Sequence, residues 1–164
     1  EHVLFIAPMS NPWTMSGARV NIPASGFGCS EVREGPVTIQ RNGKIFLVYS
    51  ACDTGKPDYK LGMLSADQLA DVLNPKAWIQ HPDPVFTRSD ADGVYGPGHN
   101  HFFRSPDGTE DWIVYHAKRS SEYTYEGRST RVQRFTWNQN GTPNFGVPHS
   151  LKTEIAVPSA KYTS

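Results

Sequence analysis

The sequence has few of the features that would place it outside the ordinary globular proteins. Its 164 residues include only 2 cysteines, and 16 Lys and Arg balance 16 Asp and Glu. A balanced charge without a basic tract makes nucleic acid and anionic membranes poor candidate partners. No apolar run approaches the ~20 residues that cross a bilayer, and residues 3–6 resemble a strand and not a signal sequence. We expect a soluble chain without its targeting segment, forming one domain or part of one.

Helix and cysteine are both scarce. Only residues 65–73 are predicted to form one to two helical turns, with Ser65 as the N-cap and Asn74-Pro75 as the stop. Cys29 and Cys52 flank a predicted hairpin and are close enough in principle for a disulfide. Isolated cysteines are more often free and half-buried, so we predict two free thiols and keep the disulfide as the alternative.

The sequence does contain a well-defined hairpin with one carboxylate at its mouth. Asn42-Gly43 separates two apolar runs and tolerates the positive φ values of a type I′ turn. Glu34 stands at the open end, directly before Gly35-Pro36.

This hairpin recurs later in the chain. Gly35-Pro36 corresponds to Gly96-Pro97-Gly98, and Asn42-Gly43 corresponds to Asp107-Gly108. The predicted strand 46–51 corresponds to 112–117. Each copy continues into a third strand and then a short outer strand. Four short strands per unit, with Gly and Pro turns, is the pattern of a β-propeller blade.

The predicted fold is therefore all-β, a single partial domain over residues 1–164. It comprises about two and a half four-stranded blades of a propeller: the end of one blade (1–30), a second blade (31–90), and a third blade with a C-terminal tail (91–164). A free-standing β-sandwich of short strands fits the same strand pattern and is the alternative.

Three passages resemble glycoside hydrolase family 43, whose members are five-bladed propeller arabinofuranosidases, arabinanases and xylosidases. The passages are Glu34-Gly35-Pro36 before a hairpin that ends Tyr49-Ser50-Ala51, residues 95–100 before Phe102-Phe103, and residues 137–143. They appear in the family's order and spacing. The resemblance covers essentially the whole chain but only the later half of a family domain, and its nearest form is the exo-acting α-L-arabinofuranosidases.

The resemblance implies that Glu34 is the general acid that protonates the leaving-group oxygen. An inverting glycosidase also needs an ionised carboxylate ~6.5–9.5 Å away to activate water. The family takes this base, and a second Asp that orients the acid, from blades that precede this segment. We therefore predict that the isolated chain has no significant activity. Without the resemblance, Glu34 would be read as an exposed turn carboxylate.

The resemblance also marks His99 and Arg128. The family's matching His points into the central cavity and contacts substrate or a cation, often calcium, so a structural Ca²⁺ near His99 is expected although no cofactor is required. The alternative for His99 is a structural role. Arg128 matches an Arg that contacts the sugar through its guanidinium. Arg131 is the competing match, and a solvated strand-entry Arg is the alternative.

Other conspicuous residues are expected to be structural. Trp112 and Trp137 are predicted to pack between blades, and His116 to be a structural group of its strand. Residues 90–93 resemble a calcium loop, but the glycine falls too early, so a polar turn is expected. Residues 119–127 are expected to form a long loop at the blade mouth that shapes the pocket.

Two classes of function remain after these comparisons. The first is the C-terminal part of a secreted, extracellular, inverting glycosidase acting on arabinose-containing plant polysaccharide, with β-xylosidase or arabinanase activity as variants of it. The second is a non-catalytic propeller fragment that binds sugar or assembles. A partial propeller exposes apolar blade faces. The expected protein partner is therefore the N-terminal blades or a second copy of the chain.

Overall fold

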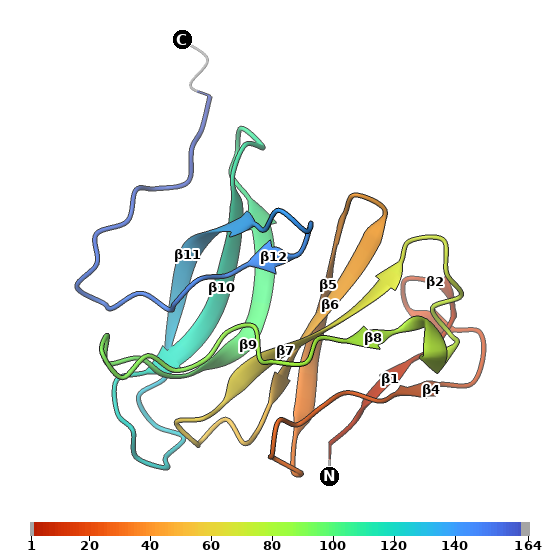
Figure 1. Cartoon of the computed structure of the whole chain (residues 1–164), viewed down its shortest axis with the longest axis horizontal. Coiled ribbons are helices and arrows are strands. Elements are labelled where there is room, and N and C mark those ends of the chain that lie inside the picture. Colours follow the sequence, from red (N-terminus) through yellow and green to blue (C-terminus); the bar gives the residue numbers. More distant parts are fainter. Residues whose placement is uncertain (1, 162–164) are drawn as a thin grey trace.

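The computed structural model describes residues 2–161 and is built almost entirely from short strands (Figure 1). The elements are β1 (Leu4–Ile6), β2 (Met9–Asn11), β3 (Thr14–Met15), β4 (Val20–Ile22), β5 (Arg33–Arg41), β6 (Lys44–Ala51), β7 (Lys60–Asp67), the 3₁₀ turn η1 (Pro75–Ala77), β8 (Ile79–Gln80), β9 (Tyr95–Arg104), β10 (Asp111–Lys118), β11 (Ser129–Trp137) and β12 (Pro143–Asn144). Within residues 2–161, no helix has the length and apolar character needed to cross a membrane.

The predicted repeat is confirmed as two antiparallel four-stranded sheets. One has the order β5-β6-β7-β8 and the other the order β9-β10-β11-β12, so each is a simple up-and-down meander. The two sheets lie side by side, with β5 and β9 as corresponding first strands (Figure 1). This repetition is typical of adjacent propeller blades, and the free-standing sandwich is not what the chain forms.

The first 22 residues add two small two-stranded sheets. β1 pairs with β4, and β2 pairs with β3 in a hairpin. The β1–β4 sheet packs against the β5–β8 sheet, because Leu4 and Ile22 share a buried cluster with Tyr49, Leu64 and Trp78. The exact blade boundaries at residues 30 and 90 stay predictions.

The hairpin turn was predicted correctly and the helix was not. Asn42 and Gly43 have φ values of 50° and 75°, as a type I′ turn requires. Ser65 does not cap a helix, because it lies inside β7 and pairs with both Phe46 and Ile79. After β7, Asp67 and Asp71 accept hydrogen bonds from backbone N–H groups two residues later, which favours two consecutive turns over a helix.

A hydrophobic core joins the two four-stranded sheets. Its members on one side include Phe46, Met63 and Phe86, and on the other Tyr115 and Phe135. Phe86 meets Tyr115 edge to face, with 4.9 Å between ring centroids. Side chains that alternate along β6 and β10 thus bury one face of each sheet against the other.

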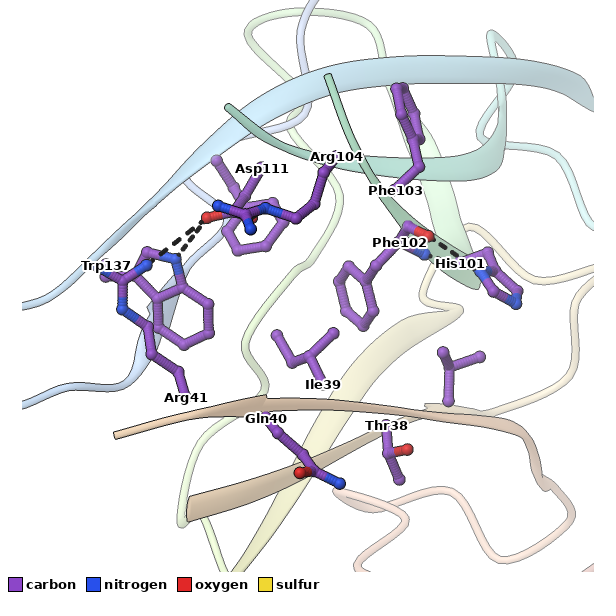
Figure 2. Close-up of a pocket in the computed structure, with 12 residues that line it drawn as sticks. Thr38, Ile39, Gln40, Arg41, His101, Phe102, Phe103, Arg104, Asp111 and Trp137 are labelled. Carbon is purple, nitrogen blue, oxygen red and sulfur yellow. Dashed lines mark hydrogen bonds and ion pairs between the residues drawn. The ribbon is translucent and has the colours of Figure 1, made fainter. Parts of the chain in front are cut away.

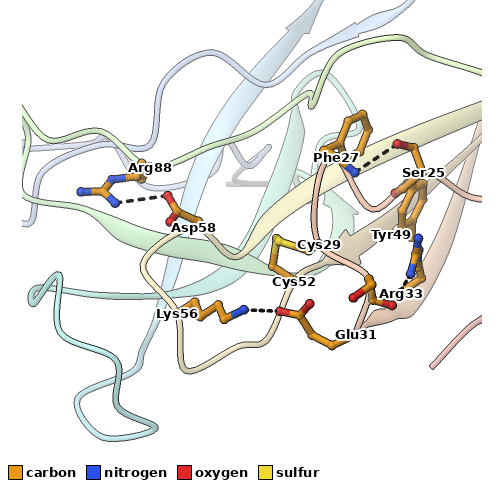
Figure 3. The surroundings of a disulfide bond; sticks show 11 residues. Ser25, Phe27, Cys29, Glu31, Arg33, Tyr49, Cys52, Lys56, Asp58 and Arg88 are labelled. Atoms are coloured by element: carbon orange, nitrogen blue, oxygen red, sulfur yellow. Dashed lines mark hydrogen bonds and ion pairs between the residues drawn. A yellow bond between two sulfur atoms is a disulfide. The ribbon is translucent and has the colours of Figure 1, made fainter. Parts of the chain in front are cut away.

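The two cysteines form a disulfide, so the prediction of free thiols was wrong. The Cα atoms of Cys29 and Cys52 lie 5.1 Å apart (Figure 3). The reason is the strand register. Arg33 pairs with Ala51 at the open end of the hairpin, and the Cys52 N–H donates to the Val32 carbonyl, so the entry and exit segments run together.

Candidate active site

Glu34 lies at an irregular point near the start of β5. It pairs with Ser50, after which the strand register shifts before Val37. Gly35 occupies this bulge with φ of 56°, a conformation that side chains rarely adopt. The Glu34 side chain is 30% exposed, so it is partly buried and still accessible to solvent.

His99 lies at the matching point of β9. Its φ is 50°, and its backbone N–H donates to the Ser50 hydroxyl over 2.7 Å. The ring faces Glu34, with 3.7 Å between Nδ1 and Oε1. Gly35 makes this approach possible, since a Cβ there would stand only 3.2 Å from the ring. The structure therefore brings the two predicted residues Glu34 and His99 together.

Tyr59, which the sequence did not single out, is the nearest donor to the carboxyl. Its hydroxyl donates to Glu34 Oε1 over 2.8 Å and lies 3.4 Å from His99 Nδ1. The residue comes just before β7 and is completely buried.

His116 of β10, expected to be structural, packs into this cluster. Its ring stacks on Tyr59 with 5.5 Å between centroids and 3° between planes, and it lies 6.3 Å from the His99 ring. Burial, helped by the positive charge of Arg128, lowers the pKa of His116 to about 4. The imidazole is thus neutral above about pH 5.

Arg128 is exposed at the edge of the same cluster. Its Nε donates to the Tyr125 carbonyl over 3.1 Å, and its Nη1 to the Thr54 hydroxyl over 3.4 Å. The same hydroxyl lies 3.4 Å from His116 Nε2. A guanidinium in this place has donors available for a ligand above the carboxyl.

Arg131, the competing candidate, lies elsewhere. It is 6% exposed and pairs across strands with Tyr115, under a C-terminal segment that includes His149. Its Nε donates to the Ser129 hydroxyl over 3.3 Å, while neither terminal nitrogen has a hydrogen-bond partner. Arg131 is therefore not part of the Glu34 cluster.

Two loops beside the cluster are tied together by a buried ammonium group. Lys118 is 1% exposed, and its Nζ donates to three backbone carbonyl oxygens, those of Gly55, Glu122 and Thr124. Asp53 accepts hydrogen bonds from Tyr123 and Tyr125 over 3.1 and 2.9 Å. Residues 119–127 are thus a loop at the mouth, as predicted, and they are fixed to the loop that follows Cys52.

Ion pairs line the outside of that second loop (Figure 3). Lys56 pairs with Glu31, and Arg88 pairs with Asp58 over 3.2 Å. Residues 90–93 form a polar turn in which Arg88 also contacts Asp90 and Ser89 donates to Asp92. The expected polar turn is confirmed, and its carboxylates are already paired.

The described residues do not build a calcium site. Across residues 2–161, no group of three or more His, Cys, Asp or Glu side chains could hold a metal ion. His99 offers one nitrogen, whereas Ca²⁺ takes six to eight oxygen ligands. The calcium contact at His99 therefore stays a prediction that needs ligands from outside these residues.

A cavity of about 410 Å³ lies between the far ends of β5 and β9 (Figure 2). At one end, Asp111 pairs with Arg41 and Arg104 over 3.6 and 3.4 Å and accepts a hydrogen bond from Trp137. Trp137 also packs against Phe46 of the neighbouring sheet at 5.8 Å, as predicted. Trp112 instead stacks on Phe103 of its own sheet. The carboxylate and the two guanidinium groups in this cavity are thus paired with one another.

A shallower hollow of about 470 Å³ adjoins Glu34 itself. It is lined by His2, Val3, Leu4, Phe5, Arg19, Arg33, Glu34 and Pro36. Within residues 2–161, no second carboxylate contacts Glu34. The arrangement thus offers one carboxyl beside a phenol and an imidazole, and among the described residues no second carboxylate is in contact with it to activate water.

Known proteins resemble the chain over nearly its full length. The model of the Glycosyl hydrolases family 43 matches residues 1–143. An extracellular exo-α-(1→5)-L-arabinofuranosidase of Streptomyces avermitilis is 46% identical over 154 residues, which are 88% of this chain and 32% of that protein. α-L-Arabinofuranosidase 43 of Humicola insolens is 42% identical with the same coverage.

Solved structures of glycoside hydrolases also resemble this chain. An α-L-arabinofuranosidase from Lactobacillus brevis superposes with a TM-score of 0.85 at 38% identity, over 93% of this chain and 49% of that one. A thermostable family-43 glycoside hydrolase superposes with a TM-score of 0.79 at 26% identity, over 96% and 50%.

The chain thus spans about a third of the length of the curated relatives and about half of the solved chains. Its fold is all-β and corresponds to part of their propeller domain. The chain belongs to the Glycosyl hydrolases family 43.

Proposed function

We propose that this chain supplies the general acid of an inverting α-L-arabinofuranosidase that acts on arabinose-containing plant polysaccharide outside the cell. The observation that carries the proposal is the contact of the Glu34 carboxyl with the Tyr59 hydroxyl and the His99 ring, near the start of β5 and β9. Relatives named as extracellular arabinofuranosidases support the substrate class and the location.

The proposed reaction begins with proton donation. Glu34 gives its proton to the glycosidic oxygen, the C–O bond breaks with its electron pair on that oxygen, and the leaving alcohol departs. Water attacks the sugar carbon from the opposite face and loses its proton to a second carboxylate. In this proposal that carboxylate comes from outside the described residues. His99 and Arg128 bind the sugar, with Arg128 donating to hydroxyl oxygens.

The proposal predicts that the chain alone is inactive, since general-base assistance is worth ~10²–10⁴-fold. The test compares the chain with a chimera in which it replaces the matched segment of the Streptomyces avermitilis relative. We expect the chimera to hydrolyse an aryl α-L-arabinofuranoside and the isolated chain not to do so.

Two Glu→Gln variants of the chimera complete the test. With a leaving group that needs a proton, Glu34→Gln should abolish turnover, while Glu154→Gln, exposed in the C-terminal segment, should leave it unchanged. A chimera that binds arabino-oligosaccharide but never turns over would favour the non-catalytic binding module. Preference for aryl xylosides, or for internal cleavage of arabinan, would favour the xylosidase or arabinanase variant.

A further inference from the structure

The two oxygens of the Glu34 carboxyl are not equivalent. Tyr59 donates to Oε1 over 2.8 Å, and His99 Nδ1 also approaches Oε1, at 3.7 Å. Within residues 2–161, no hydrogen bond is made to Oε2. One oxygen is therefore occupied by a neighbour, and the other is available to carry a proton towards a ligand.

The Tyr59 ring packs against two neighbouring strands of the β9–β12 sheet. One face stacks on His116, with 3° between the ring planes. On the side of β9, a Cβ at Gly98 would overlap Tyr59 Cε1 and Cδ1, so the ring lies directly against the glycine backbone. Gly98 and His116 are paired across β9 and β10. The direction of the hydroxyl is thus fixed by backbone and ring contacts together.

Two of the groups beside the carboxyl, the phenol of Tyr59 and the imidazole of His116, are uncharged over most of the pH range. Burial raises the pKa of Tyr59 far above its ordinary value, so the phenol keeps its proton wherever a glycosidase works. His116 is uncharged above about pH 5, because its pKa is lowered to about 4. A neutral donor binds a carboxyl without forcing it to ionise as an adjacent ammonium or guanidinium would.

We infer that Tyr59 is the positioning residue of Glu34: it holds Oε1, directs the acidic proton to Oε2, and binds the carboxylate more tightly once that proton has left. The inference rests on the proposed function of Glu34. In the proton-transfer step the proton passes from Oε2 to the glycosidic oxygen, and the C–O electron pair goes to that oxygen. The negative charge stays on Glu34, and Tyr59 keeps its own proton. A hydrogen bond that strengthens as charge develops favours the transition state over the ground state.

The first test uses this chain alone and needs no turnover. Glutamate carboxyls labelled with ¹³C are followed by NMR against pH, and Glu34→Gln assigns the Glu34 signal. In Tyr59→Phe the midpoint of that signal should move to higher pH, because the ionised form loses a donor. Tyr115→Phe is the matched control: it is equally buried and also donates to a single side chain, Gln133, so its loss should leave the midpoint in place. An unmoved midpoint in a folded Tyr59→Phe protein overturns the inference.

A second measurement covers the case in which Tyr59→Phe does not fold. Replacing the tyrosines with 3-fluorotyrosine strengthens the phenol as a donor with little change in shape. The Glu34 midpoint should then move to lower pH, and an unchanged midpoint contradicts the inference.

The chimera separates this inference from the proposed function. With an alkyl leaving group, Tyr59→Phe should lower kcat tenfold or more, as loss of a hydrogen bond to a charged group predicts. With a dinitrophenyl arabinofuranoside, whose leaving group needs no proton, kcat of Tyr59→Phe should fall less than twofold. If Glu34→Gln retains turnover of the alkyl substrate, the proposed function fails. If Glu34→Gln abolishes turnover of the alkyl substrate but Tyr59→Phe slows both substrates equally, only the role of Tyr59 fails.

Discussion

Removal of the Cys29–Cys52 disulfide should destabilise the protein by about 3 kcal/mol. The bond joins residues 23 apart in sequence, and in the chain-entropy model a closed loop of that length restricts the unfolded chain by about this amount. The loop it closes contains β5, β6 and Glu34. The bond thus constrains the segment that carries the candidate acid.

The assay is guanidinium unfolding followed by tryptophan fluorescence. The Cys29→Ser/Cys52→Ser double variant is compared with the parent, with and without a reductant. We expect the unfolding free energy of the variant to fall by about 3 kcal/mol, which corresponds to a lower Tm by about 6–12 °C in a chain of this size. Reductant should lower the unfolding free energy of the parent to that of the variant and leave the value of the variant unchanged.

A fall in the unfolding free energy of less than about 1 kcal/mol in the double variant would contradict this prediction. That result would mean that the unfolded chain is already compact between residues 29 and 52, or that the two thiols are not bonded. A thiol titration of the unfolded parent separates these cases, since a bonded pair gives no free thiol.

Three further outcomes are expected. Lys118→Met should lower the unfolding free energy by about 3 kcal/mol in urea titrations, because three carbonyl oxygens, one of them in a buried hydrogen bond, lose a charged donor. A loss under about 1 kcal/mol would show that water replaces the ammonium. The His116 pKa of about 4 lies below the ordinary 6.5, so the folded state binds fewer protons and stability should fall as pH drops from about 6.5 to 4. The loss of unfolding free energy from protonation of His116 is about 1–2 kcal/mol, a value reduced because the ring is partly exposed. In His116→Phe this part of the pH dependence of unfolding should be absent. Trp137→Ala should cost about 3 kcal/mol by calorimetry through lost packing on Phe46, more than Trp13→Ala, whose side chain is 81% exposed.

The fold was largely predictable because its signals are local. Asn42-Gly43 specifies a turn through its own φ values, and the same spacing of turn and strand returns at Asp107-Gly108. The helix prediction at residues 65–73 failed because Ser65 was read as a cap, although its neighbours Leu64 and Ala66 are both buried in β7. Tertiary burial extended the strand through a residue whose local preference favoured a helix start.

The site was predictable only in part. Glu34, His99 and Arg128 stand in motifs, whereas Tyr59 directly precedes a strand and Lys118 ends one, both at positions without a distinctive pattern. Tyr59 reaches Glu34 across the hairpin, from 25 residues away, and Lys118 reaches Gly55 from 63 residues away. The first contact crosses from β5 to the start of β7 within one sheet, and the second joins the two sheets. Spacing along the chain specifies neither.

The glycines of the repeated motif show why both sheets are needed to form the site. Gly35 in β5 lies against the ring of His99 from β9, and Gly98 in β9 lies against the ring of Tyr59 from the β5–β8 sheet. Each sheet thus leaves a space without a side chain, and the other sheet fills it with an aromatic ring that faces Glu34. A glycine next to proline near the start of β5 and of β9 thus marks a close approach between the two sheets. An alanine at position 98 should displace Tyr59 while keeping its hydroxyl. Gly98→Ala should therefore reproduce the effect of Tyr59→Phe on the Glu34 signal, and a folded Gly98→Ala protein with the parent's titration would show that the ring is not held by this contact.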